Sequence, residues 1–204
     1  MEIAGPLGSA SDLHAKYCRS IGSRKLLISS LNLRSVHKMA HHENQPKWKG
    51  KANAKVEGPK AEQVWPLLED FFGLNKWFPT LSTCLPVEGI SGQPGCVRYC
   101  AGFKTPVNNG EEIVNWTKQK LLSIDKTELT FSYSIIDGNV GFNSYVSTIK
   151  VVPNEDGCNV EWLYEVEPVE GWTQEDLKTF ITSGLLVMAK RMEEALQAAQ
   201  TSAS

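Results

Sequence analysis

The sequence contains no histidine beyond residue 42. All of its histidines, His14, His37, His41 and His42, lie in the first part of the chain. A serine or cysteine nucleophile usually takes its proton to a histidine, and most catalytic zinc sites include one. The region after Trp48 is therefore a poor candidate for a Ser-His-Asp triad, a Cys-His pair or a histidine-rich metal centre. Any acid–base chemistry there would have to use Asp, Glu, Tyr, Lys or Cys.

Other scarce features narrow the class of protein further. The five cysteines (Cys18, Cys84, Cys96, Cys100 and Cys158) are an odd number without a close metal-type pair, which favours a reducing compartment over a disulfide scaffold. The net charge is −2, and no dense basic stripe follows residue 60, so nucleic acid is an unsuitable partner. No apolar run reaches membrane-spanning length. We expect a cytoplasmic monomer without a bound metal.

Residues 1–45 differ in composition from the rest of the chain. No acidic residue occurs between Leu13 and His42, while lysine, arginine and serine are frequent, as in organelle transit peptides. Residues 5–9 (Gly-Pro-Leu-Gly-Ser) are also typical of an expression tag, and Met39 could be a native start. A tag or untranslated read-through, a plastid or mitochondrial transit peptide over 1–38, and a functional extension all stay open. In each case we expect a mobile or loosely packed tail, followed by one domain over residues 46–200.

The domain begins with a strand, two short helices and then a series of strands. Alternation predicts strands over 48–56, 81–88, 96–103, 111–124, 129–135, 143–152 and 159–167. An apolar stripe at helical spacing starts near Lys60 and continues to Phe72, and residues 74–79 are typical of a second short helix. In the fourth strand, Lys118 and Lys120 indicate the solvent side, so Gln119 should face inward.

A long helix is predicted at the C-terminal end. Thr173 is a suitable N-cap followed by acidic residues, and apolar residues then recur from Leu177 to Leu196, after which the helix should fray. The order of elements predicts an α+β fold in which a curved antiparallel sheet wraps around this helix. A hollow between the sheet and the helix is where a small ligand would bind.

Arg98 is the least expected residue of the predicted sheet. It lies in the otherwise apolar run Cys96-Val97-Arg98-Tyr99-Cys100-Ala101. A guanidinium keeps its charge and is costly to bury without partners. Alternation alone does not say which face of this strand is inside, so Arg98 points either to solvent or into a polar cavity.

Several segments resemble one known family. These are Trp48-Lys49-Gly50-Lys51, residues 62–71, Val87-Glu88-Gly89, residues 95–99 and residues 116–121. They are similar to the plant lachrymatory-factor-synthase-like proteins of the Bet v 1/START-like superfamily, also called polyketide cyclase/dehydrase and lipid-transport proteins. The resemblance covers Trp48 to about Ala199 and implies a helix-grip fold with an internal cavity and no cofactor.

The resemblance also implies a set of site residues. In the onion-type enzyme an arginine, a glutamate and a tyrosine of the pocket rearrange a small unsaturated sulfenic acid. The arginine corresponds to Arg98 and the tyrosine to Tyr145, which would be catalytic if this protein is an enzyme. The glutamate corresponds to Gln119, which cannot exchange a proton near neutral pH. The other candidate ligand-binding residues are Tyr133, Trp162, Phe131, Leu185 and Met188.

Three functions follow from these expectations. The first is binding or transfer of a small hydrophobic or sulfur-containing metabolite whose polar or anionic end meets Arg98, Gln119 and Tyr145. The second is a cofactor-free isomerase or cyclase-type enzyme in which Arg98 stabilises a developing anion. The third is a ligand-gated signalling partner. A carboxylate within hydrogen-bond reach of Arg98 would favour the enzyme, with Glu111, Glu112 or Tyr133 as the groups that could replace the missing acid.

Overall fold

The computed structural model describes residues 46–106 and 111–202, and the expectations for the first 45 residues lie outside this part. Seven antiparallel strands form one sheet in the order β1-β7-β6-β5-β4-β3-β2. In chain order the strands are β1 (Trp48–Glu57), β2 (Thr83–Glu88), β3 (Val97–Pro106), β4 (Glu112–Asp125), β5 (Thr130–Gly138), β6 (Val146–Asn154) and β7 (Gly157–Val166).

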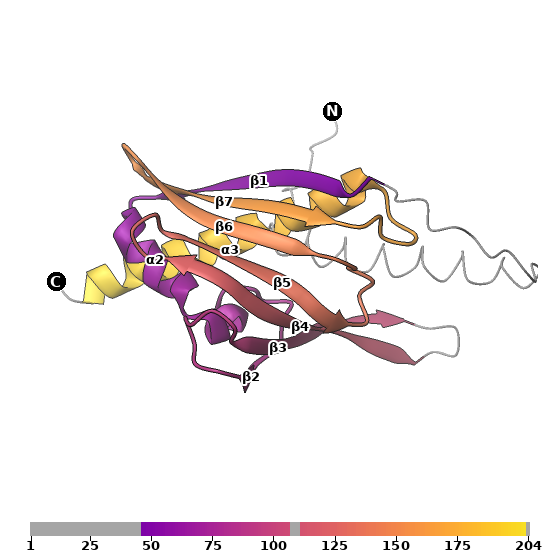
Figure 1. The fold of residues 1–204 in the computed structure, drawn as a ribbon. Coiled ribbons are helices and arrows are strands. Elements are labelled where there is room, and N and C mark those ends of the chain that lie inside the picture. The colour runs from indigo at the N-terminus through magenta and orange to yellow at the C-terminus, as the bar shows by residue number, and fades with distance from the viewer. Residues whose placement is uncertain (1–45, 107–110, 203–204) are drawn as a thin grey trace, which may run out of the picture.

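Three helical segments accompany the sheet. They are α2 (Ala61–Glu69), the 3₁₀ helix η1 (Phe71–Lys76) and the long α3 (Gln174–Ser202). The sheet curves along α3, while α2 and η1 belong to the connection from β1 at one edge of the sheet to β2 at the opposite edge (Figure 1). The predicted helix-grip fold is therefore confirmed.

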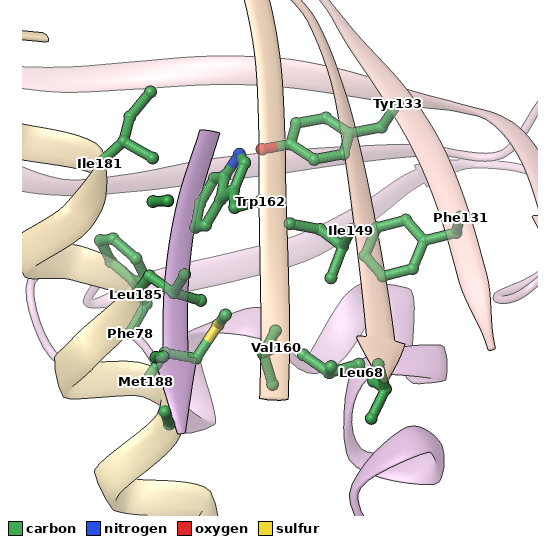
Figure 2. Close-up of a cluster of buried hydrophobic side chains, with 14 of the residues drawn as sticks. Leu68, Phe78, Phe131, Tyr133, Ile149, Val160, Trp162, Ile181, Leu185 and Met188 are labelled. Carbon is green, nitrogen blue, oxygen red and sulfur yellow. The ribbon is translucent and has the colours of Figure 1, made fainter. Parts of the chain in front are cut away.

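The strands alternate as predicted because one face of the sheet packs on α3. In β7, Val160, Trp162 and Tyr164 are buried and Leu163 is exposed. The same core cluster includes four fully buried residues of α3, which are Leu177, Leu185, Met188 and Met192. Figure 2 shows this layer, with Leu185 and Met188 of α3 facing the aromatic and aliphatic side chains of the sheet. The core thus lies between the concave face of the sheet and the long helix.

The ends of the helices differ from the expected boundaries. The first predicted helix breaks at Asp70, whose backbone (φ −66°, ψ 76°) leaves the α conformation, so Phe71 and Phe72 belong to η1. The predicted cap of α3 is present: the Thr173 hydroxyl accepts from the Asp176 amide at 3.1 Å, and Asp176 Oδ2 accepts from the Thr173 amide at 2.9 Å. The helix does not fray after Leu196 but continues to Ser202.

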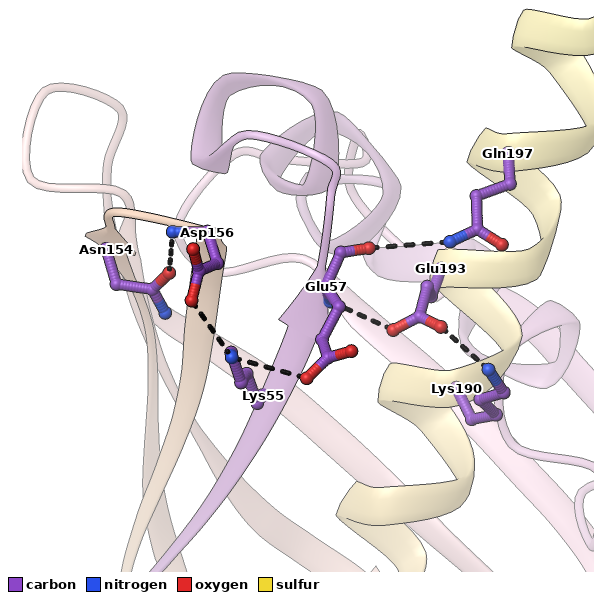
Figure 3. A network of polar contacts seen from close by, with 7 residues as sticks. All are labelled: Lys55, Glu57, Asn154, Asp156, Lys190, Glu193 and Gln197. Carbon is purple, nitrogen blue, oxygen red and sulfur yellow. Dashed lines mark hydrogen bonds and ion pairs between the residues drawn. The ribbon is translucent and has the colours of Figure 1, made fainter.

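Near its C-terminal end, α3 is attached to β1 by a buried carboxylate. Glu193 Oε2 accepts from the Glu57 amide at 2.9 Å, and Glu193 Oε1 accepts from Lys190 Nζ at 2.7 Å (Figure 3). Gln197 Nε2 donates to the Glu57 carbonyl at 3.4 Å. Because the lysine and the amide both stabilise the charged form, the pKa of Glu193 is lowered. These contacts fix the helix against the edge strand.

Candidate functional site

Arg98 is buried, with 3% of its surface exposed. Its Nε and Nη2 donate to Gln119 Oε1 at 2.9 and 2.6 Å, and its Nη1 donates to the Phe71 carbonyl at 2.6 Å. The guanidinium carbon also lies 3.9 Å from the centre of the Phe71 ring and 5.4 Å from that of Tyr133. Both contacts fall in the range of cation–π attraction. Among the described residues the charge of Arg98 has hydrogen-bonding partners but no ion pair.

Gln119 joins the arginine to the rest of the site. It lies directly opposite Arg98 in the register of β3 and β4, and it is buried as predicted. Its Oε1 faces Arg98, while its Nε2 donates to Thr117 Oγ1 at 3.0 Å. One side of the amide is therefore used to satisfy a buried cation, and the other side reaches a hydroxyl two residues along the same strand.

Tyr133 and Trp162 line two cavities, and the larger of these two, about 90 Å³ in volume, lies between the sheet and α3. Most of its wall is apolar. Phe142, in the loop after β5, stacks on Tyr145 with ring centres 5.7 Å apart and meets Phe180 of α3 edge-on. The full lining consists of Leu74, Phe78, Thr80, Leu81, Phe103, Thr117, Gln119, Tyr133, Ile135, Val140, Phe142, Tyr145, Trp162, Phe180 and Ile181.

The polar groups of this cavity are neutral. Trp162 Nε1 donates to the Tyr145 hydroxyl at 3.2 Å. Burial raises the pKa of Tyr145, and burial raises that of Tyr133 well above its ordinary value. Both phenols are protonated at neutral pH and can donate hydrogen bonds. Together with Thr117 and Gln119 they suit an uncharged oxygen, or the oxygen of a weakly acidic group, better than a second cation.

A smaller void of about 20 Å³ lies beside the guanidinium. Arg98, Phe131 and Met188 line this void and not the larger cavity, while Tyr133 and Trp162 line both. At roughly the volume of one or two water molecules, it is too small for an organic ligand. Arg98 is thus separated from the larger cavity and reaches it through Gln119.

The remaining candidates fall elsewhere. Leu185 is fully buried in the core and lines neither of these two cavities. Glu111 and Glu112 are exposed, and Glu112 pairs with Lys104 at 3.0 Å. Neither can replace the glutamate that the resemblance implies at the position of Gln119. The carboxylate that does line the small void is Asp70, whose Oδ2 accepts from Lys76 Nζ at 2.8 Å.

Several lining residues were not expected from the sequence. Thr117 shares a strand face with Gln119, a signal that could have placed it in the site. Phe142 lies in a loop where no periodicity applies, and its stacking on Tyr145 depends on the tertiary fold. Tyr145 itself precedes β6 rather than lying within it, next to Ser144 with a φ of 52°.

The described residues contain no cluster of His, Cys, Asp and Glu able to hold a metal ion. No helix in the same part of the chain is long and apolar enough to cross a membrane.

Solved structures with the same fold come from bacteria and plants. The protein XoxI from Bacillus cereus is 22% identical with a TM-score of 0.54, covering 76% of this chain and 99% of its own. A Thermobifida fusca protein is 20% identical with a TM-score of 0.54, covering 72% and 93%. The ginseng major latex-like protein 151 from Panax ginseng is 16% identical with a TM-score of 0.56, covering 72% and 97%. At these identities the likeness concerns the fold.

A family model provides the assignment that these structures leave open. The model described as polyketide cyclase / dehydrase and lipid transport matches residues 51–199. This range holds α2, η1, α3 except its last turn, every strand except the start of β1, and every residue that lines the two cavities. The chain belongs to the polyketide cyclase/dehydrase and lipid-transport family.

Proposed function

We propose that the protein binds a small, mostly apolar molecule with one hydrogen-bonding end in the cavity between the sheet and α3. The observation that carries this proposal is the composition of the cavity wall. Aromatic and aliphatic side chains form most of it, and its polar groups come from Tyr133, Tyr145, Thr117 and Gln119. A few polar groups in an otherwise apolar cavity are typical of small-molecule sites.

The cavity volume limits the size of the ligand. Cavities for drug-sized ligands measure roughly 300–1,000 Å³, and an apolar cavity of about 150 Å³ holds benzene. At about 90 Å³, this one suits a molecule of only a few non-hydrogen atoms. A long acyl chain would require α3 or the loop around Phe142 to move. A small metabolite, including a small sulfur-containing one, therefore fits the cavity better than a membrane lipid.

The hydrogen-bonding groups favour binding over proton-transfer catalysis. An isomerase that moves a proton needs a group whose pKa lies near the working pH. The cavity offers Gln119, which does not titrate, and two tyrosines whose pKa values are raised. The lachrymatory-factor-synthase-like reaction, with Arg98 and Tyr145 as its groups, is thus the second candidate. It would gain support if Gln119→Glu converted a small unsaturated sulfenic acid, generated in situ, faster than the wild type does.

Binding can be tested with probes of increasing size. Dimethyl sulfoxide, cyclohexanol and decanoic acid would be titrated into ¹⁵N-labelled protein while the indole N–H resonance of Trp162 is followed. We expect saturable shifts from dimethyl sulfoxide and none from decanoic acid. Ile181→Phe should fill the cavity and abolish the shift. The same change at Ile90, which is exposed, should leave it unaltered. Equal shifts in the wild type and Ile181→Phe would refute the proposal.

A further inference from the structure

Cys84 and Cys100 face each other across neighbouring strands. They are direct partners in the antiparallel register of β2 and β3, and their sulfur atoms lie 3.5 Å apart. Directly opposed residues of such a pair have Cα atoms about 4.5–5.5 Å apart, within the range of about 4.4–6.8 Å that disulfides span. A bond between these sulfurs would therefore need side-chain rotation but no rearrangement of the backbone.

The surroundings of the two cysteines lower the pKa of one thiol and raise that of the other. A hydrogen bond from Cys100, the charge of Arg98 and the backbone amides of Leu74 and Asn75 lower the pKa of Cys84 to about 6, against its partial burial. The contact with Cys84 and burial raise the pKa of Cys100 far above its usual range. Cys84 is therefore the more acidic thiol of the pair.

The two cysteines also differ in their exposure to solvent. Cys84 lies on the edge strand β2 and is partly exposed, whereas Cys100 is almost fully buried behind it. A reagent from solvent meets Cys84 first. The buried Cys96 and Cys158 provide an internal comparison, because burial raises their pKa values, to about 11 for Cys158. Neither has a sulfur partner among the described residues.

We propose that Cys84 and Cys100 form a peroxide-reactive dithiol site, in which Cys84 attacks the oxidant and Cys100 closes an intramolecular disulfide. In the first step the Cys84 thiolate attacks one oxygen of hydrogen peroxide. The O–O bond breaks, Cys84 becomes a sulfenic acid, and the leaving hydroxide takes a proton to become water. In the second step the Cys100 sulfur displaces the sulfenic oxygen, which leaves as a second water.

The overall reaction is balanced. Two thiols and one hydrogen peroxide give one disulfide and two waters, and the two electrons lost by the sulfurs reduce the peroxide. A low-molecular-weight thiol in excess would reverse the bond by exchange. The disulfide would also remove the acidic thiol whose pKa the charge of Arg98 helps to lower. This site is separate from the proposed ligand cavity, whose lining includes neither cysteine.

Intact-mass measurement of the full chain tests the site. Reduced protein would be treated at pH 7 with a small excess of hydrogen peroxide, alkylated and digested with trypsin. We expect a loss of two hydrogens and a link between the peptides 77–98 and 99–104, reversed by dithiothreitol. Fragmentation of the first peptide separates Cys84 from Cys96. Cys84→Ser and Cys100→Ser should each abolish the link, whereas Cys96→Ser and Cys158→Ser should keep it.

A trapping experiment tests the order of the two steps. In Cys100→Ser the sulfenic acid has no resolving thiol, so dimedone should label Cys84. Cys84 should react at least tenfold faster than Cys158, because a buried thiol with a pKa of about 11 is almost entirely protonated. Labelling of Cys158 at the same rate as Cys84 would overturn the proposal. A disulfide formed through Cys96 or Cys18 instead of Cys100 would also overturn it.

Discussion

Removal of the Gln119 acceptor should destabilise the protein because it leaves the buried charge of Arg98 without two of its hydrogen bonds. In Gln119→Leu, the side chain keeps a similar volume, but Arg98 Nε and Nη2 lose the oxygen to which both donate. Arg98 is 3% exposed, so its guanidinium cannot recover these bonds from bulk water. Hydrogen bonds to a charged group contribute about 1.5–3 kcal/mol each, and breaking a buried charged pair costs about 3–5 kcal/mol. Because both bonds share one acceptor, we expect a loss of about 3 kcal/mol.

Urea denaturation followed by tryptophan fluorescence measures this loss. With a denaturant slope of about 2 kcal/mol per molar urea, the midpoint should fall by about 1.5 M. Gln93→Leu is the matched control, since Gln93 is exposed and the same change there should alter stability by less than about 0.5 kcal/mol. The reasoning fails if the two variants lose equal stability.

A double variant separates the unpaired charge from the lost packing. Arg98→Met combined with Gln119→Leu removes both the cation and its acceptor, so it should be more stable than Gln119→Leu alone. Gln119→Glu should keep the acceptor and add an ion pair. A carboxylate beside Arg98 would have a lowered pKa, so its stabilisation is present at neutral pH and is lost as the pH falls through that value. If the double variant recovers nothing, the cost arises from packing.

Three further changes have defined outcomes. Tyr145→Phe removes the acceptor of Trp162 Nε1 and should cost about 1 kcal/mol in urea denaturation, with a shift of the Trp162 indole resonance. The lowered pKa of Glu193 means that its stabilisation is complete above its unfolded-state pKa and is lost as the pH falls through the folded-state value, so Glu193→Gln should flatten the decline of thermal stability as the pH falls below the ordinary pKa of 4.5. Gly102→Ala should lower the melting temperature, because its methyl group would collide with the backbone of residues 80–82; an unchanged melting temperature would contradict this contact.

The sequence was sufficient to predict most of the fold. Alternation in β7 is regular because Val160, Trp162 and Tyr164 all pack on one side, and the Thr173 cap marks the start of α3 before any tertiary contact is considered. Such signals are local. The break at Asp70 was missed because the apolar stripe continues through it, although the backbone there leaves the helix.

The site depends on features that no local pattern contains. Val97 and Arg98 are both buried, so alternation is absent at the point where it was needed to orient the arginine. The pairing of Cys84 with Cys100 follows from the register of β2 and β3, which shifts between Pro86 and Glu88, and the register of β3 with β4 shifts between Ala101 and Lys104. Since each shift changes which residues face each other, the dithiol could not be deduced from the spacing of the cysteines.

The pairing of β1 with β7 has a consequence for how the chain folds. Trp48 lies opposite Val166, so the first strand of the domain is hydrogen-bonded to the last. During synthesis β1 emerges long before its partner, and neither β7 nor α3 is available to cover its apolar side chains. Contacts between distant parts of a chain are slow to form because the long intervening loop must first close. The sheet can be completed only late in translation, and until then β1 is an unpaired strand that a chaperone could bind.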